Sequence, residues 1–262
     1  MSNLKMPFDN LVLRPVRLRD LDDLEKMAHD AHFGLTSLPR DRGLLEQKII
    51  FSLNSFDLSD EEAALSERLY IFMLEDVTSQ TICGTCSLFS HVFQDTFDYS
   101  YQVDQVIMKA SSFQNSKIYR NLIFRRANQS FTEIGGLYLK PAFRNKGVGR
   151  FLSLSRFVFL ASFSKRFVSP VIAMMRGVID QKGRSPFWDY LGRKFVDWPF
   201  KKAAYYYASY PEFVRDLIPS LPIFVDLLPV DVQAVIGRSH IYTAPALKLL
   251  QNEGFDFTED RK

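Results

Sequence analysis

Cysteine is scarce in this sequence: Cys83 and Cys86 are the two cysteines among 262 residues. They form a C-x-x-C pair, a spacing found in redox motifs and in half of a four-ligand zinc site. A second cysteine pair is missing, and residues 81–89 form a β-like run, in which positions three apart face opposite sides. We therefore expect two partly buried thiols in a reducing compartment, and no metal.

Long hydrophobic runs and a strong excess of one charge are missing too. The longest apolar runs, such as residues 157–163, are too short to span a bilayer, and the first residues lack the charged segment and apolar core of a secretion signal. The 33 basic and 30 acidic side chains leave a formal charge of +3, which gives no case for nucleic-acid binding. We expect a cytoplasmic protein with no membrane and no nucleic-acid partner.

Apolar residues, by contrast, are plentiful. A hydrophobic content of 47%, with 24 phenylalanines, is enough for a substantial core in one large domain or two small ones.

The most informative stretch is a strand, a glycine loop and a helix between residues 132 and 166. Residues 134–139 read as a short apolar strand, which Pro141 ends, and residues 148–163 read as a long apolar helix. Gly147 and Gly149 lack the β-carbons that would keep an anion away from the first helical N–H groups, and Arg144 and Lys146 add positive charge. This order predicts a phosphate-binding loop, although a glycine-rich turn that merely starts a helix would look the same.

The spacing of this loop is R-x-x-G-x-G. It is neither the P-loop pattern nor G-x-G-x-x-G, because no Gly-Lys-Ser/Thr follows and the glycine spacing differs. R-x-x-G-x-G after an apolar strand resembles the acyl-CoA signature of the GNAT superfamily of N-acyltransferases, whose loop amides hold the CoA pyrophosphate.

Four further segments carry a closer resemblance. Residues 34–39 (GLTSLP), 175–180 (MRGVID), 185–188 (SPFW) and 234–240 (AVIGRSH) are similar to segments of arginine N-succinyltransferases, a GNAT-like family. The resemblance runs from about residue 11 to residue 255. It implies an α+β, GNAT-like fold with a mixed central sheet flanked by helices, and transfer of a succinyl group from succinyl-CoA to the α-amine of L-arginine in arginine catabolism.

The expected elements agree with such a fold. Residues 11–16 read as a strand followed by a helix that Asp20 can cap, and residues 68–76 and 81–89 read as a hairpin. Residues 98–109 and 117–126 are β-like, although the second run could be helical on pattern alone. Residues 169–175 should form a strand parallel to residues 134–139, from which the resemblance implies it splays. Proline-started helices at 186 and 245 should each lead into a short strand.

We expect two parts: residues 1–217 as a GNAT-like acyl-CoA-binding domain, and residues 218–262 as the start of a second, truncated GNAT-like unit. The proline-punctuated run at 218–229 is the best candidate boundary.

The candidate site residues follow from the loop and the resemblance. His240 matches the family's proposed proton donor, and its ordinary pKa suits transfer near neutral pH. Glu133 is a candidate base for the incoming ammonium, or else an exposed acid at a strand end. The residues expected to bind acyl-CoA are Leu137, through its main-chain N–H, with Leu139, Arg144, Asn145, Lys146, Gly147, Val148, Gly149 and Arg150.

A succinyl group brings a free carboxylate, for which Arg176 and Arg184 are candidates, although either could be a surface ion-pair partner. Thr36, Ser37 and Ser185 belong to the segments that carry the resemblance and are candidate substrate contacts, although Thr36 and Ser37 could simply form a turn.

Some residues depart from the family pattern. The family carries Glu where this sequence has Met174, Asp where it has Ala204, and Arg where it has Gln102, and family members continue past residue 255 into a further β-rich stretch. Carboxylates should hold an arginine substrate, so the loss of two acids leaves three alternatives open: L-arginine, a different amine acceptor, or a CoA-binding non-catalytic subunit. Whether the chain forms a homo- or hetero-oligomer also stays open.

Overall fold

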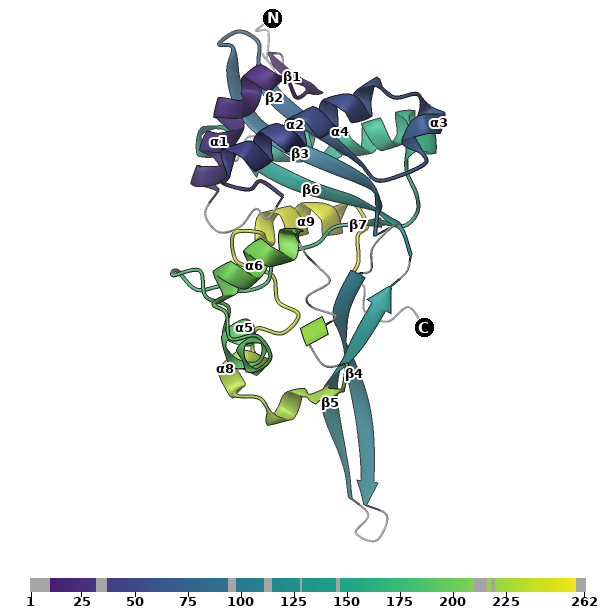
Figure 1. Cartoon of the computed structure of the whole chain (residues 1–262), viewed down its shortest axis with the longest axis vertical. Coiled ribbons are helices and arrows are strands. Elements are labelled where there is room, and N and C mark those ends of the chain that lie inside the picture. Colours follow the sequence, from purple (N-terminus) through teal and green to yellow (C-terminus); the bar gives the residue numbers. More distant parts are fainter. Residues whose placement is uncertain are drawn as a thin grey trace, which may run out of the picture. The chain divides into compact units, whose positions relative to one another are not determined.

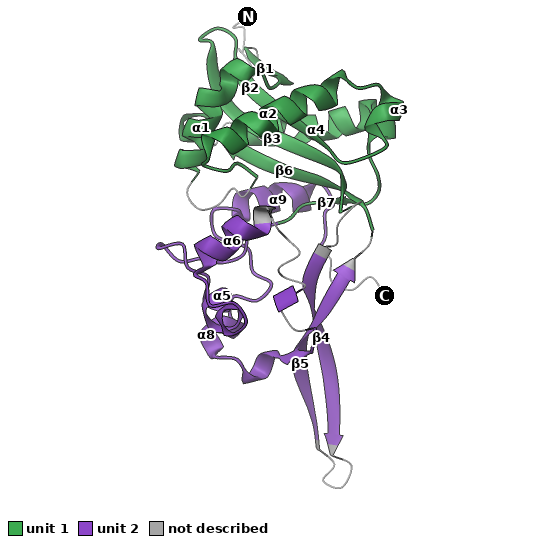
Figure 2. Cartoon of the chain, in the orientation of Figure 1, with its two compact units in different colours: residues 1–95, 129–174 green, residues 96–128, 175–262 purple. Residues whose placement is uncertain are grey.

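The computed structural model describes residues 10–31, 37–93, 98–110, 115–127, 129–144, 147–209, 216–217 and 220–257. The chain divides into two compact units: unit 1 comprises Met1–Asp95 and Gln129–Met174, and unit 2 comprises Thr96–Asn128 and Met175–Lys262 (Figure 2). This division differs from the expected boundary at residue 217, because residues 96–128 and 175–217 belong to the same compact unit as the C-terminal residues. That residues 218–262 begin a second GNAT-like unit stays a prediction.

Unit 1 is built on a five-stranded sheet in the order β1-β2-β3-β6-β7 (Figure 1). Neighbouring strands are antiparallel except β6 and β7, which are parallel. The GNAT-like α+β fold predicted from the sequence, a mixed sheet flanked by helices, is confirmed. The strands are β1 (Leu11–Pro15), β2 (Arg68–Asp76), β3 (Thr81–Val92), β6 (Phe131–Leu139) and β7 (Val171–Ile172), and the helices are α1 (Leu21–Asp30), α2 (Arg42–Asp57), α3 (Asp60–Ala63) and α4 (Val148–Ser162).

Both faces of this sheet are covered. Leu69, Ile71 and Met73 of β2 pack with α1 and α2 in one buried cluster, whereas the alternate residues Tyr70 and Phe72 contact Phe159 of α4. A strand covered on both faces reads as a continuous apolar run, as β2 does. Burial of each such side chain stabilises the fold by roughly 1.5–3 kcal/mol.

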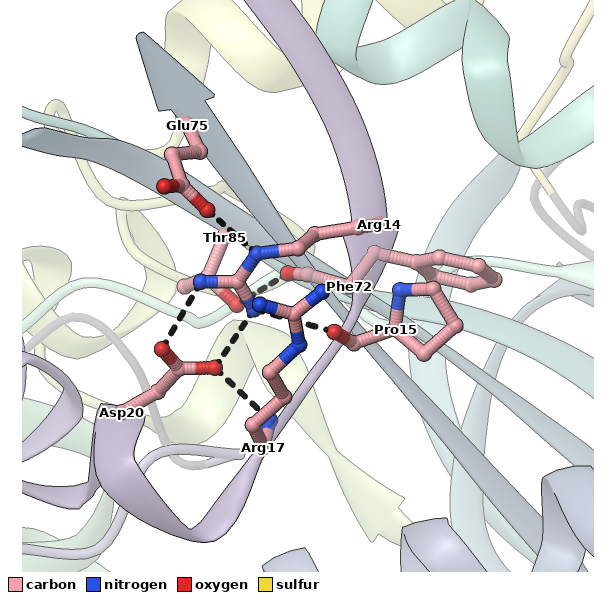
Figure 3. A network of polar contacts seen from close by, with 7 residues as sticks. All are labelled: Arg14, Pro15, Arg17, Asp20, Phe72, Glu75 and Thr85. Carbon is pink, nitrogen blue, oxygen red and sulfur yellow. Dashed lines mark hydrogen bonds and ion pairs between the residues drawn. The ribbon is translucent and has the colours of Figure 1, made fainter. Parts of the chain in front are cut away.

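A network of hydrogen bonds and ion pairs joins β1, the turn before α1 and β2 (Figure 3). The Asp20 carboxylate accepts hydrogen bonds from the Arg14 guanidinium at 2.7 and 2.9 Å and from the Arg17 N–H at 2.7 Å, and Arg14 also pairs with Glu75. The hydrogen bond to Asp20 is the main cause that raises the pKa of Arg14. The prediction that Asp20 caps α1 with its side chain is wrong, because its carboxylate is engaged by Arg14 and Arg17 instead.

Unit 2 contains less regular structure. Its sheet has the order β4-β5-β8, all antiparallel, and the long β4–β5 hairpin is its most regular part (Figure 1). The 117–126 run is therefore a strand rather than a helix. The strands are β4 (Asp98–Ala110), β5 (Asn115–Ala127) and β8 (Ile223–Phe224), and the helices are α5 (Pro186–Tyr190), α6 (Phe200–Ser209), α8 (Val230–Gln233) and α9 (Ala244–Asn252).

The short strands expected after α5 and α9 are absent from the described residues, and that prediction is wrong. The Val196 N–H bonds to the Gly192 carbonyl at 2.9 Å, and the Phe255 N–H bonds to the Leu250 carbonyl at 3.1 Å. Because these donors close turns at the helix ends, they are not used in a strand ladder. Within the described part of the chain, no helix is long and apolar enough to cross a membrane.

Candidate functional site

The N-terminus of α4 offers main-chain donors to an anion. The first hydrogen bond of the helix runs from the Phe151 N–H to the Gly147 carbonyl at 3.1 Å, so the N–H groups of Val148, Gly149 and Arg150 have no acceptor within the helix. Among the described residues, no side chain caps this end, and Gly147 turns the chain into the helix with a φ of 79°. Donors at the positive end of a helix dipole favour a phosphate.

The residues before α4 hold the loop against β6. The Arg144 Nε donates to the Leu139 carbonyl at 2.9 Å, and its guanidinium lies 5.8 Å from the centre of the Tyr138 ring. Asn145 and Lys146 lie outside the described residues. At Gly149 an added β-carbon would come no closer than 3.9 Å to Leu139, so packing does not demand glycine there.

A β-bulge interrupts the pairing of β3 with β6. Thr85 pairs with Tyr138 and Ser87 with Gly135, so β6 has two residues, 136 and 137, where β3 has one. Gly136 has a φ of +60°, and an added β-carbon would lie 2.6 Å from the Ser87 Oγ, so the bulge requires glycine. Leu137, the expected main-chain donor to the acyl group, is the residue after Gly136 in this bulge.

The parallel pairing of β6 with β7 is short. It joins Thr132 to Val171 and Glu133 to Ile172, and β7 ends there, although residues 169–175 were expected to form the strand. The parallel arrangement is thus confirmed, and a β7 of two residues agrees with an opening between these strands beyond Glu133.

Glu133 lies in the field of a half-buried lysine. Burial lowers the pKa of Lys48, and the nearby carboxylates of Glu67 and Glu133 oppose that effect. A carboxylate beside an ammonium group is stabilised in its charged form and is a weaker base. Glu133 thus lies near a positive charge, and its role as a general base stays a prediction.

In unit 2, hydrogen bonds hold His240 in one orientation. Its side chain is largely buried, and its backbone N–H donates to the Arg176 carbonyl at 2.7 Å, beside a bridge between Gly177 and Ser239. The imidazole Nδ1 accepts the Tyr242 N–H at 3.2 Å. Since Nδ1 is an acceptor, the proton of the neutral ring lies on Nε2, which can donate it.

The two candidate arginines differ in their partners. The Nε of Arg176 is buried without a hydrogen-bond partner among the described residues, burial lowers the pKa of its guanidinium, and the group lies 5.8 Å from the Phe200 ring centre. Arg184 is exposed and pairs with Asp180 at 2.7 Å. Arg176 therefore retains an unsatisfied donor for a carboxylate, whereas Arg184 has the surface ion pair that was its alternative interpretation.

The other candidate contacts have structural explanations of their own. The Ser185 Oγ accepts the Trp188 N–H at 3.2 Å and so caps α5. Ser37 is half-buried, and Thr36 lies outside the described residues. That these three residues contact the substrate stays a prediction.

Of the residues that depart from the family pattern, Met174 is exposed, Ala204 lies in α6, and Gln102 of β4 accepts a hydrogen bond from Arg125 at 2.7 Å.

Burial keeps the two cysteine side chains in the protonated thiol form. Cys83 and Cys86 are free and fully buried, and burial raises the pKa of the Cys86 thiol to about 12. The structure therefore supports two buried thiols, more deeply buried than expected. No group of three or more metal-ligating side chains occurs in the part of the chain that the structure describes.

One buried residue beside this site was missed by the sequence analysis. Arg156 of α4 is 2% exposed and donates to the Gly135 carbonyl, next to the bulge. The signal that could have identified it is a single arginine on a helix that is apolar on most sides.

Comparisons with known proteins agree over most of the chain. The family model described as the beta subunit of arginine N-succinyltransferase matches residues 11–260. An arginine N-succinyltransferase from Citrobacter koseri is 36% identical over 94% of this chain and 71% of the relative, and one from Yersinia enterocolitica is 34% identical over 94% and 70%. Among solved structures, subunit AI of the arginine/ornithine succinyltransferase from Pseudomonas aeruginosa matches with a TM-score of 0.80 and 27% identity, over 95% of this chain and 72% of that one.

Proposed function

Because the chain belongs to the arginine N-succinyltransferase family, we propose that it transfers the succinyl group of succinyl-CoA to the α-amine of L-arginine. An acyl-CoA co-substrate fits the N–H groups of Val148 and Gly149 at the start of α4, which have no acceptor within the helix, and the succinyl group follows from the names of the relatives. The single observation that carries the proposal is the family match across residues 11–260, which includes the acyl-CoA loop and His240.

Unit 1 receives the thioester in this proposal. The N–H groups of Val148, Gly149 and Arg150 bind the CoA pyrophosphate, and main-chain N–H groups of the bulge at Gly136 and Leu137 receive the thioester carbonyl oxygen. Donors placed where negative charge develops stabilise the tetrahedral intermediate more than the substrate.

His240 is the candidate proton donor for the leaving group. The unprotonated amine attacks the thioester carbon, and the intermediate collapses with cleavage of the C–S bond. The departing thiolate takes the proton from the His240 Nε2, and the proton that the attacking nitrogen loses as the amide forms returns to the imidazole. The hydrogen bond from the Tyr242 N–H to Nδ1 supports this role, because it keeps the donor proton on Nε2. The ammonium of the acceptor first loses a proton to water or to Glu133.

Arg176 is the better of the two candidates for the succinyl carboxylate. Its unpaired buried Nε can form a charge-assisted hydrogen bond, whereas Arg184 would first have to leave Asp180. We therefore assign Arg176 to the acyl group and expect acetyl-CoA, which lacks that carboxylate, to be a poorer donor.

The acceptor is the least constrained part of the proposal. Met174 and Ala204 stand where the resemblance implies acids, so the guanidinium of arginine must find other carboxylates. A different amine acceptor is the second candidate, and only these two positions and Gln102 favour it.

The test measures release of CoA thiol from succinyl-CoA with and without L-arginine, with acetyl-CoA in parallel. We expect release that depends on L-arginine and is absent with Nα-acetylarginine, a matched control that lacks the free α-amine. Acyl-CoA binding without release for any of a panel of amines would reject the transferase and favour a CoA-binding subunit. Release with another amine but not with arginine would change the acceptor alone.

A further inference from the structure

Among the described residues of unit 1, two arginines are buried and a third, Arg14, is half-buried, and their partners differ. Arg14 pairs with Asp20 and Glu75, and Arg166 pairs with Asp60 at 2.6 Å. Arg156, at 2% exposed, is the largest of the fully buried side chains among the described residues, and the acceptors of its hydrogen bonds are neutral. A buried charge without an opposite charge costs several kcal/mol. An arginine in this position therefore calls for an explanation beyond packing.

The three contacts of Arg156 fix its guanidinium between α4 and β6. Its Nε donates to the Ser153 carbonyl at 3.2 Å, its Nη2 to the Ser153 Oγ at 2.9 Å, and its Nη1 to the Gly135 carbonyl at 3.3 Å. Ser153 is itself buried. Two of the contacts lie within one turn of α4, so the helix orients the guanidinium and the third contact reaches the sheet.

The third contact is with the Gly135 carbonyl, directly before the bulge at residues 136 and 137. The Gly135 carbonyl and the Gly136 N–H belong to one planar trans peptide and point in opposite directions. A donor that holds this carbonyl on the α4 side therefore directs the Gly136 N–H away from α4. A hydrogen bond to the carbonyl also polarises the peptide and strengthens its N–H as a donor.

We infer that Arg156 is a positioning residue for acyl transfer: by holding the Gly135 carbonyl, it sets the orientation of the bulge whose N–H groups receive the thioester oxygen. Its positive charge, in a region of low dielectric constant, also favours the negative oxyanion over the neutral thioester. The inference rests on the proposed function and deepens it, because it states what holds the oxyanion donors in place.

The first measurement does not depend on turnover. Succinyl-CoA labelled with ¹³C at the thioester carbonyl is bound to the protein, and the infrared band of that carbonyl is compared with its position in water. We expect a shift to lower frequency in the wild type, because donors polarise the bond. Arg156→Met should remove most of the shift, and Arg156→Lys, which keeps the charge, should retain part of it.

The second measurement separates kcat from KM in the thiol-release assay. Loss of an oxyanion-hole donor costs about 10²–10³ in kcat, so a residue that only orients such donors should cost about 10–10² on replacement by Met. We expect the KM for succinyl-CoA to change less than about threefold, because the phosphate contacts at α4 are unaltered, and Arg156→Lys to recover part of the lost kcat.

Arg166→Lys is the matched control, because Arg166 is also buried in unit 1 but hydrogen-bonds to Asp60 and to the carbonyls of Ser55 and Leu58. We expect it to lower thermal stability without changing the carbonyl band or kcat.

A wild-type band at its aqueous position, or a folded Arg156→Met with the wild-type band and kcat, would overturn the inference. So would losses that only follow the unfolded fraction, or failure of Arg156→Lys to fold. If the wild type shows the shift and Arg156→Met removes it, but L-arginine releases no thiol, the proposed acceptor fails and the inference stands.

Discussion

The two units differ in how much regular secondary structure they contain. Unit 1 has a five-stranded sheet covered on both faces, and the buried Arg156 of α4 reaches the sheet through the Gly135 carbonyl. Unit 2 has a long hairpin, a two-residue β8 and helices of four to ten residues, and it exposes Leu227, Val230 and Ile241 at 76%, 81% and 76%. Its candidate groups, His240 and Arg176, lie on irregular segments joined by one β-bridge.

In our proposal, unit 1 carries the groups that bind acyl-CoA, and unit 2 carries the candidate proton donor. An acyl-CoA site needs several N–H groups in fixed positions: we assign the helix start to the phosphate and the bulged strand to the thioester oxygen. A proton donor needs one oriented side chain, and two hydrogen bonds at His240 are enough to orient it. Loops held by few contacts commonly carry such residues.

The largest expected effect comes from His240→Ala. We expect kcat to fall by about 10²–10⁴, because general acid catalysis is lost, while the Kd for succinyl-CoA stays within about twofold. Thiol release and calorimetric titration measure the two quantities. His91→Asn, which alters a buried histidine of unit 1, is the control that should leave kcat unchanged. Turnover of His240→Ala at the wild-type rate would remove His240 from the mechanism.

A pair of core variants tests whether the units unfold separately. Leu45 of α2 and Leu250 of α9 are buried helical leucines, one in each unit. We expect Leu45→Ala and Leu250→Ala each to cost about 2–5 kcal/mol of unfolding free energy, because a cavity replaces the side chain. In a denaturant titration each variant should shift only its own unit's transition. A single transition, shifted equally by both, would show one cooperative unit.

A glycine pair in the acyl-CoA loop separates backbone strain from ligand approach. Gly147→Ala places a β-carbon at a φ of 79° and should cost about 1–2 kcal/mol of stability. Gly149→Ala lies in the helix without that strain and should leave stability unchanged or raise it by up to about 1 kcal/mol. Both should weaken succinyl-CoA binding in calorimetric titration. If Gly149→Ala binds as the wild type does, close approach of the ligand at residue 149 is wrong.

The smallest expected effect is a dependence of stability on pH. Burial lowers the pKa of His91 in unit 1. Below about pH 6.5 the imidazole therefore binds a proton in the unfolded chain but stays neutral in the folded chain until the pH is lower. Unfolding free energy should therefore fall as pH drops from about 6.5 towards the folded pKa, and His91→Asn should flatten that slope in denaturant titrations. A wild-type slope retained in the variant would assign it to other groups.

Asp226 of unit 2 should affect stability in a lower pH range than His91 does. The Arg120 N–H and guanidinium lower the pKa of its carboxylate, so its stabilising contribution is present above about pH 3.9 and is lost only as pH falls through the lower folded pKa. Asp226→Asn should leave the slope near pH 6 unchanged.

Much of unit 1 could be predicted because its signals are local. Residues 68–76 and 81–89 give the hairpin of β2 and β3, and the glycine loop before residues 148–163 gives the start of α4. The bulge could not be predicted, because it depends on the register of β6 against β3, which no short pattern encodes. Arg156 was missed since arginine on a helix is ordinarily expected at the surface.

Unit 2 was less predictable because its contacts are distant and its helices are short. Arg120 and Asp226 lie 106 residues apart, and β8 has two residues, too few for periodicity. His240 was identified by resemblance, since one histidine in a polar turn has no pattern of its own.

The insertion of the hairpin between β3 and β6 bears on how the protein folds during synthesis. Val92 of β3 pairs with Phe131 of β6, and within the inserted segment Asp98 pairs with Ala127. A hairpin that forms first brings the two ends of the insertion together, so the later pairing closes a much shorter effective loop and loses less entropy. Until the ribosome releases β6, the β3 edge is left without its neighbour in the sheet, and early formation of the hairpin shortens that exposure.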